Sequence, residues 1–167
     1  MRDHRPAIAI ATLAERPELV AEAVDIAWRE WGHSMLESDH ERMLREAEED
    51  SRLHAPMSAG FVAVEAGRAV GVVQLHEFEI DAIRDRSPWV CGMVVRPEYR
   101  GMGVGRRLLA ALEQFAAASG IAQLWVFTED AAGFYERCGW LRHGEAVEHG
   151  EAGIVLTRHL AARPASS

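Results

Sequence analysis

A glycine-rich stretch in the second half of the chain has the residue types that bind phosphate. It reads Arg100-Gly101-Met102-Gly103-Val104-Gly105-Arg106, shortly after Pro97 and directly before an amphipathic segment. Glycines at alternate positions let the backbone turn tightly and approach a ligand with no Cβ in the way. Free N–H groups at the start of the following helix, its dipole and the nearby guanidinium groups would attract phosphate oxygens. The pattern therefore predicts a site for a small polyanion.

The surrounding charge fits a local anion site on an acidic protein. The net charge is −8, and all 18 basic residues are arginines because the chain has no lysine. Four of them, Arg96, Arg100, Arg106 and Arg107, fall within twelve residues around the glycines. A net negative charge argues against general attraction to nucleic acid or to an anionic membrane surface. Arginines that merely begin a helix stay open as a simpler explanation of the cluster.

Other glycine-rich phosphate loops differ from this one. The stretch lacks the Gly-Lys-Ser/Thr ending of nucleoside triphosphate loops. A dinucleotide-binding fold would place its loop after the first strand and an acidic residue after the next strand. Here the loop comes late in the chain, so neither of these two ligand classes is favoured.

The segment Val94–Gly105 resembles the acetyl-CoA-binding signature of the GNAT superfamily of N-acetyltransferases. The signature has Arg or Gln, two residues, Gly, one residue, then Gly or Ala, which Arg100, Gly103 and Gly105 match. A second stretch, Leu124–Trp140, is similar to another signature of the superfamily, in which a strand leads to a short helix with a tyrosine. That tyrosine is Tyr135, and Gly139-Trp140 matches the ending.

The resemblance implies an acetyl-CoA-dependent N-acetyltransferase that needs no metal. A primary amine would attack the thioester directly, in a complex of enzyme and both substrates. An N–H near Val94 would stabilise the oxyanion, and Tyr135 would protonate the leaving thiolate as general acid. Many members carry Asn where this chain has Thr128, whose hydroxyl can still form a hydrogen bond. The implied acetyl-CoA-binding residues are Met93, Val94, Val95, Arg100, Gly101, Met102, Gly103, Val104, Gly105, Arg106, Thr128 and Phe134.

A base that deprotonates the attacking amine is not evident. An alkylammonium has a pKa of about 10.4 and must lose a proton before it attacks. The strand expected over 89–95 contains no acid. The open candidates are His76, Glu77, Glu79, Glu30, His33 and a water relay, and a substrate whose amine is already neutral would need no base. A non-catalytic acyl-CoA-binding or sensing module on the same fold is therefore the alternative function, and the acceptor is either a small amine or a peptide or protein N-terminus.

The elements that must position these residues follow from hydrophobic periodicity and turn residues. We expect an α/β (α+β) fold of the GNAT kind, with a mixed, mostly antiparallel central sheet and about four helices. Residues 1–160 would form one domain, and 161–167 a frayed tail. The expected strands are Ala7–Leu13, Ala59–Glu65, Ala69–Glu77, Ser87–Val95, Ile121–Phe127 and a closing pair within Trp140–Leu160. Ala66-Gly67-Arg68 would form the turn between the second and third strands, and the closing pair would turn near His149-Gly150. The expected helices are Glu15–Trp31, Asp39–Asp50 (with Asp39 as the cap), Met102–Ser119 and Ala131–Cys138.

The remaining patterns exclude other classes of site. Cys91 and Cys138 lack the paired spacing of a disulfide framework or a zinc site. His143, Glu145, His149 and Glu151 do not have the spacing of a helical metal motif, so no metal site is expected. No secretion signal or membrane span is visible. We therefore expect a cytoplasmic protein whose partners are acetyl-CoA and an amine, with a homodimer left open.

Overall fold

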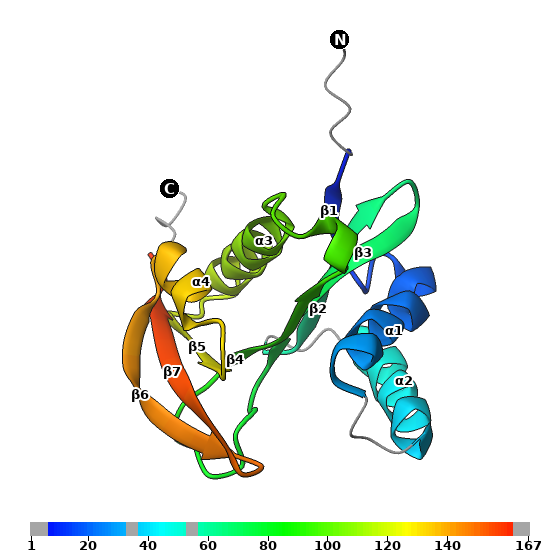
Figure 1. Cartoon of the computed structure of the whole chain (residues 1–167). Helices are drawn as coiled ribbons and strands as arrows, with labels where there is room; N and C mark the ends of the chain where they lie inside the picture. Colours follow the sequence, from blue (N-terminus) through cyan, green and yellow to red (C-terminus); the bar gives the residue numbers. More distant parts are fainter. Residues whose placement is uncertain (1–6, 33–36, 53–56, 162–167) are drawn as a thin grey trace.

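One sheet of seven strands organises the molecule. The computed structural model describes residues 7–32, 37–52 and 57–161. The strand order is β1-β2-β3-β4-β5-β7-β6, and every neighbouring pair is antiparallel except β4 with β5 (Figure 1). This confirms the mixed, mostly antiparallel sheet. The strands are β1 (Ala9–Thr12), β2 (Ala59–Glu65), β3 (Arg68–His76), β4 (Trp89–Val95), β5 (Gln123–Thr128), β6 (Leu141–Glu148) and β7 (Glu151–His159).

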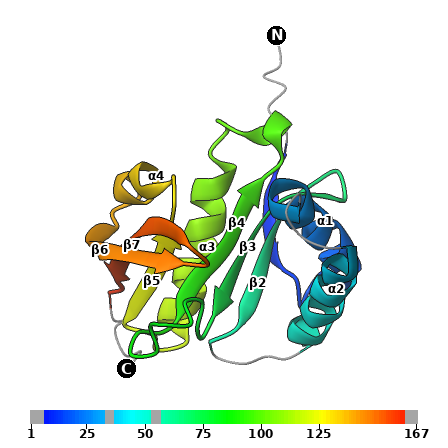
Figure 2. The same cartoon turned by 60° about the horizontal axis from the view of Figure 1, so that its bottom comes forward.

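Four α-helices are described, as expected. They are α1 (Val20–Trp31), α2 (Glu37–Arg52), α3 (Val104–Ala118) and α4 (Ala132–Arg137). Figures 1 and 2 show α1 and α2 on one face of the sheet and α3 on the other. In the part of the chain that the structure describes, no helix is both long and apolar enough to cross a membrane. Of the expected tail 161–167, only Ala161 lies within the described residues.

Two helix starts differ from the expectation. The first helix begins at Val20 because Pro17–Leu19 forms a separate 3-10 turn in front of it. Proline presets the backbone for a first turn and lacks the N–H that a continuing helix needs. The second helix begins at Glu37, so Asp39 lies inside its first turn and is not its cap. There the Asp39 carboxylate forms an ion pair with the Arg42 guanidinium at 2.7 Å.

Two tight hairpin turns lie where the sequence predicts them. Ala66 and Gly67 have φ values of 50° and 77° between β2 and β3, and His149 and Gly150 have 48° and 79° between β6 and β7. Positive φ at both central residues is typical of the tight two-residue turn that matches the twist of paired strands. The closing hairpin is therefore confirmed at His149-Gly150.

An apolar layer fills each face of the sheet. On the α3 face, Val90, Leu108, Leu112, Leu124 and Tyr135 belong to one buried cluster. On the opposite face, α1 packs through residues such as Val20, Ala23 and Ile26 against Val62, Val72 and Val94 of the strands. A separate small cluster on that same side holds Ile80, Trp89, Trp125 and Val155. The two layers hold β4 rigidly between them.

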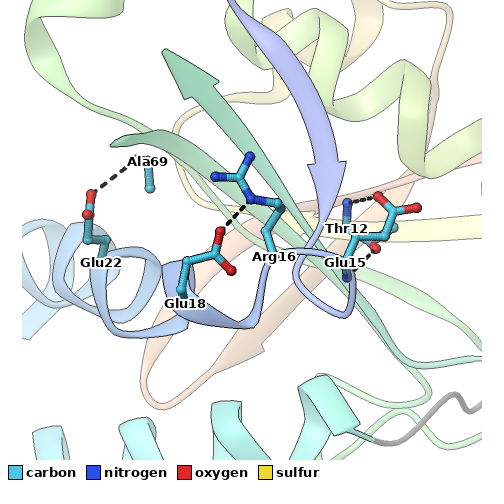
Figure 3. A network of polar contacts seen from close by, with 6 residues as sticks. All are labelled: Thr12, Glu15, Arg16, Glu18, Glu22 and Ala69. Carbon is cyan, nitrogen blue, oxygen red and sulfur yellow. Dashed lines mark hydrogen bonds and ion pairs between the residues drawn. The ribbon is translucent and has the colours of Figure 1, made fainter. Parts of the chain in front are cut away.

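Polar contacts fix the angle at which α1 leaves the sheet (Figure 3). The Thr12 N–H donates to Glu15 Oε2 at 3.2 Å, and the Glu15 N–H donates to Thr12 Oγ1 at 3.1 Å. Such reciprocal pairs satisfy backbone donors where the chain changes direction. Further along, Glu22 Oε2 of α1 accepts from the Ala69 N–H at 3.0 Å, at the start of β3. The helix is thus tied to the sheet at both its entry and its first turn.

Candidate active site

The sheet divides where β4 meets β5. Within the described residues these parallel strands pair only at Trp89↔Trp125 and Val90↔Val126. Beyond Val90, β4 continues beside β3, while β5 continues beside β7 (Figure 2). The later residues of β4 therefore have an edge without a β5 partner, which we call the fork.

A bulge in β4 lies directly at the fork. Gln74 pairs with Cys91 and Val72 with Val94, so β4 has one residue more than β3 in this interval. Gly92 supplies the extra residue with a φ of 59°, a left-handed conformation that favours glycine. Before the bulge Cys91 faces the α1 side, and after it Val94 does. Sequence alternation alone gave no sign of this shift.

Backbone groups of β4 point into the fork. The Arg96 N–H donates to Val70 O of β3 at 2.8 Å. Neighbouring residues of a strand direct their backbone groups to opposite edges, so those of Met93 and Val95 point away from β3. In agreement, Val95 O accepts from the Arg100 side chain at 2.9 Å. The Val94 side chain is buried in the α1-side core.

The glycine loop leaves an open space in front of α3. Gly101 and Gly103 have φ values of 79° and 78°, and a Cβ on either would meet nothing within 4 Å. Gly103 occupies the N-cap and provides no side-chain cap. The first N–H groups of a helix have no partner inside it, so those of Val104, Gly105 and Arg106 are available to a ligand. The predicted strand, loop and helix order is confirmed here.

Some of the other loop residues pack against neighbouring elements, and others are exposed to solvent. Val104 is buried, and Gly105 lets the Phe134 ring of α4 approach, since a Cβ there would lie 3.4 Å from Phe134 Cζ. Met102 and Arg106 are exposed. Arg100 bridges two elements, because its Nη2 also lies 3.0 Å from Glu30 Oε2 at the end of α1.

Tyr135 lies in the core of the α3 face with its oxygen free. The ring makes edge contacts with Phe134 and Trp140 at centroid distances of 5.1 and 5.5 Å. Among the described residues the hydroxyl has no hydrogen-bond partner, and it is not one of the fully buried polar atoms that lack one. Burial, and secondarily Glu79 and Cys91, raise the pKa of Tyr135 above its ordinary value. The phenol therefore stays protonated in the neutral range.

Glu79 approaches the same region from the opposite face. Its Oε2 is a buried oxygen without a hydrogen-bond partner in the described structure. Burial raises the pKa of Glu79 to about 7, the Cys91 thiol acts to lower it, and Glu148 acts to raise it. The Glu79 carboxyl lies beside the Cys91 thiol, and its charge also raises the pKa of Tyr135.

Two of the other candidates for the base are placed less favourably. Glu77 is exposed, and Glu30 forms the ion pair with Arg100. Burial lowers the pKa of His76, which Asp50 and Glu46 partly oppose, so His76 is neutral near pH 7 and able to accept a proton. His33 lies outside the described residues.

Two further sequence expectations concern Thr128 and metal ligands. Thr128 Oγ1 accepts from the Ala131 N–H at 2.9 Å and so shapes the entry to α4, while its O–H remains a donor. Of the acidic and histidine residues singled out, His143 packs its ring edge-on against Trp125 at 4.9 Å. His149 comes near Asp81 and Glu148, with ligand atoms within 4.8 Å of one another, at an exposed turn where acidic groups commonly occur without a metal.

Comparison with solved structures shows the same fold. An aminoglycoside 6'-N-acetyltransferase complexed with coenzyme A superimposes with a TM-score of 0.73 at 18% identity, covering 93% of this chain and 99% of that one. A putative streptothricin acetyltransferase from Bacillus anthracis str. Ames, in complex with acetyl coenzyme A, gives a TM-score of 0.55 at 21% identity over 65% and 67% of the two chains.

Sequence comparison places the chain within a family. The curated protein N-alpha-acetyltransferase 80 of Mus musculus is 28% identical over 143 residues, which are 80% of this chain. The match spans 41% of the length of that relative. The model of the acetyltransferase (GNAT) family matches residues 20–140, which contain the glycine loop, the fork and Tyr135. The chain therefore belongs to the acetyltransferase (GNAT) family.

Proposed function

We propose that the protein is an N-acetyltransferase that transfers the acetyl group of acetyl-CoA to a primary amine. The observation that carries the proposal is the open edge of β4 at the fork, with the buried Tyr135 on the α3 face and the buried Glu79 carboxyl beside Cys91 of β4. A proton donor and a proton acceptor near one opening suit a reaction in which an amine loses a proton and a thiolate gains one. The coenzyme A and acetyl-CoA complexes of the structural relatives support the choice of donor.

The chain's own backbone would bind acetyl-CoA. The pyrophosphate would lie on the N–H groups of residues 101–106, where the glycines leave room and the helix dipole favours negative charge. The exposed guanidinium groups of Arg100 and Arg106 would add charge-assisted bonds. The pantetheine arm would pair with the open edge at Met93 and Val95, next to Val94 and in reach of Thr128 and Phe134. Met102 and Val104 would contribute backbone only.

The chemical step uses groups on both faces. Glu79 removes a proton from the ammonium of the acceptor, and a pKa of about 7 suits transfer at neutral pH. The amine nitrogen then bonds to the thioester carbon, and the Met93 N–H, beside Val94 on the open edge, stabilises the oxyanion. When the carbon–sulfur bond breaks, Tyr135 gives its proton to sulfur, so that free CoA leaves as a thiol. The second proton of the attacking nitrogen passes to the tyrosinate, which gives the neutral amide and restores Tyr135. The reaction proceeds by direct attack within a ternary complex.

Thiol release from acetyl-CoA across a panel of amines tests this function. The panel contains small alkylamines, diamines, an aminoglycoside and peptides with free N-termini, since both acceptor classes remain candidates. We expect amine-dependent release for at least one class. Tight binding of acetyl-CoA with no release for any amine would instead indicate the alternative, a non-catalytic acyl-CoA-binding or sensing module. The sequence left that alternative open because no base was evident, and Glu79 now supports catalysis.

Replacing Gly103 with valine should weaken acetyl-CoA binding at least tenfold, measured by calorimetry. The substitution adds a β-branched side chain in the proposed pyrophosphate space and costs roughly 1–2 kcal/mol of stability in a left-handed conformation. Gly150→Val is a matched control, because Gly150 has a φ of 79° against 78° for Gly103 and equally open surroundings. Both variants should lose similar stability. Equal loss of binding in the two would argue against a ligand at Gly103.

A further inference from the structure

A cavity of about 230 Å³ lies on the α1 side of the sheet, next to the bulge in β4. Most of its wall is apolar and comes from α1, α2 and β3, with residues such as Val24, Ala27, Met43 and Val72. Gly92 lines it on the β4 side. Cavities that hold drug-sized ligands usually measure about 300–1,000 Å³, so this one fits a compact chain better than a multi-ring sugar.

The polar residues of the cavity lie at increasing distances from the fork. Nearest the fork is Gly92, which follows Cys91 in β4, the residue that lies beside the Glu79 carboxyl. Gln74 and His76 of β3 come next, and the Gln74 amide has no hydrogen-bond partner among the described residues. Beyond them, α2 contributes Glu46 and Asp50 at the exposed rim. Neighbouring strands lie about 4.8 Å apart, so a strand's width separates the carboxylates of α2 from the fork.

The rim of the cavity is negatively charged. Within the described structure Asp50 has no ion-pair partner, and the nearest cation to Glu46 is Arg42 at 3.9 Å, which also pairs with Asp39 at 2.7 Å. Gln74 is uncharged, and burial lowers the pKa of His76, so that the imidazole does not neutralise these acids near pH 7. Among the residues described, the surface thus presents an apolar recess with the unpaired Asp50 and the loosely paired Glu46 at one end.

We propose that this cavity selects a compact acceptor with two cationic groups joined by a short carbon chain, of the diamine class. The inference rests on the proposed function and names its substrate. The reacting amine lies beside Gly92 and Glu79, the methylene groups cover the apolar wall, and the second ammonium lies between Asp50 and Glu46. The site for the second ammonium, at Asp50 and Glu46, is distinct from the base Glu79, because the width of one strand separates them.

Three amines of matched length test the inference. Putrescine, n-butylamine and γ-aminobutyrate share a four-carbon amine and differ at the far end, which is an ammonium, a methyl or a carboxylate group. We expect kcat/KM to be highest for putrescine, lower for n-butylamine and lowest for γ-aminobutyrate. Each exposed carboxylate that contacts the second ammonium should raise kcat/KM roughly fivefold. The preference for putrescine should decrease as salt screens these charges.

The Asp50→Asn variant separates the distal site from the reacting end. It should lower kcat/KM for putrescine about fivefold and leave n-butylamine unchanged, and Glu46→Gln should act in the same direction. Glu49→Gln removes an exposed charge from the same helix outside the cavity lining and should change neither. An equal loss for both amines, or no preference for putrescine in the unmodified protein, would overturn the inference. Failure to acetylate any amine would overturn the proposed function instead.

Discussion

The Tyr135→Phe variant should bind acetyl-CoA normally and turn over about 100- to 1,000-fold more slowly. General acid catalysis by a positioned side chain contributes about 10²–10⁴ in rate. The phenol is the proton donor that we propose for the leaving sulfur, and its raised pKa keeps it protonated. The ring of phenylalanine preserves the contacts with Phe134 and Trp140. Since no described residue bonds to the hydroxyl, its removal leaves no buried partner unsatisfied.

The second tyrosine of the chain gives the control. Tyr99 lies just before α3, and its hydroxyl donates to Glu65 at the β2–β3 turn. Tyr99→Phe therefore should leave kcat within about twofold of the unmodified protein, as expected for a group outside the reaction. Steady-state rates at saturating acetyl-CoA measure both variants. Unchanged turnover in Tyr135→Phe would exclude Tyr135 as the acid.

Glu79→Gln should lower kcat/KM about 100-fold at pH 8 and abolish the rise of activity with pH. A base must be deprotonated to act, so activity of the unmodified protein should increase as pH passes about 7, the pKa of Glu79. Glutamine keeps the shape of the side chain and cannot accept the proton. Glu77→Gln, two residues away and exposed, should keep the original profile. An unaltered rising limb in Glu79→Gln would assign the base elsewhere.

The same substitution should stabilise the fold above pH 7. Because burial raises the pKa of Glu79 in the folded protein, its contribution to stability is fully present below about 4.5 and is lost as pH rises through about 7. The rise from 4.5 to about 7 corresponds to roughly 3 kcal/mol. Thermal unfolding at pH 8 should therefore show Glu79→Gln to be more stable, and at pH 4 the difference should vanish. A variant that is less stable at both pH values would mean that the carboxylate is not destabilised by burial.

Local sequence patterns were sufficient to predict α3 and the closing turn. The spacing that places Val104, Leu108, Leu112 and Phe115 on one helical face predicted α3, and His149-Gly150 predicted the closing turn. The start of the first helix was misplaced at Glu15, since hydrophobic spacing continues through Pro17–Leu19 although the backbone there forms a 3-10 turn. Residues that resemble a helical pattern can begin a separate turn when a proline presets it.

The fork and the base depend on contacts between distant segments. The bulge at Gly92 is visible only when β3 is paired with β4, because its evidence is one unmatched residue. Glu79 stood equal to His76 and Glu77 in the sequence, where all three lie near the end of one strand. Tertiary burial separates Glu79 and His76 from Glu77: Glu79 Oε2 is enclosed near Cys91 and burial lowers the pKa of His76, while Glu77 stays in solvent. No spacing rule reports which of three neighbouring polar residues will be desolvated.

Mass spectrometry of a complete reaction mixture tests the central claim most directly, because it follows the acetyl group itself. The protein is incubated with acetyl-CoA and putrescine. The amounts of acetylated amine and of acetate and the mass of the intact protein are then measured. We expect acetylated amine in an amount equal to the CoA released, with Cys91 and the rest of the chain unmodified, as direct attack at the fork requires. Acetate in place of acetylated amine, or an acetyl group retained on the protein, would contradict transfer to an amine within a ternary complex.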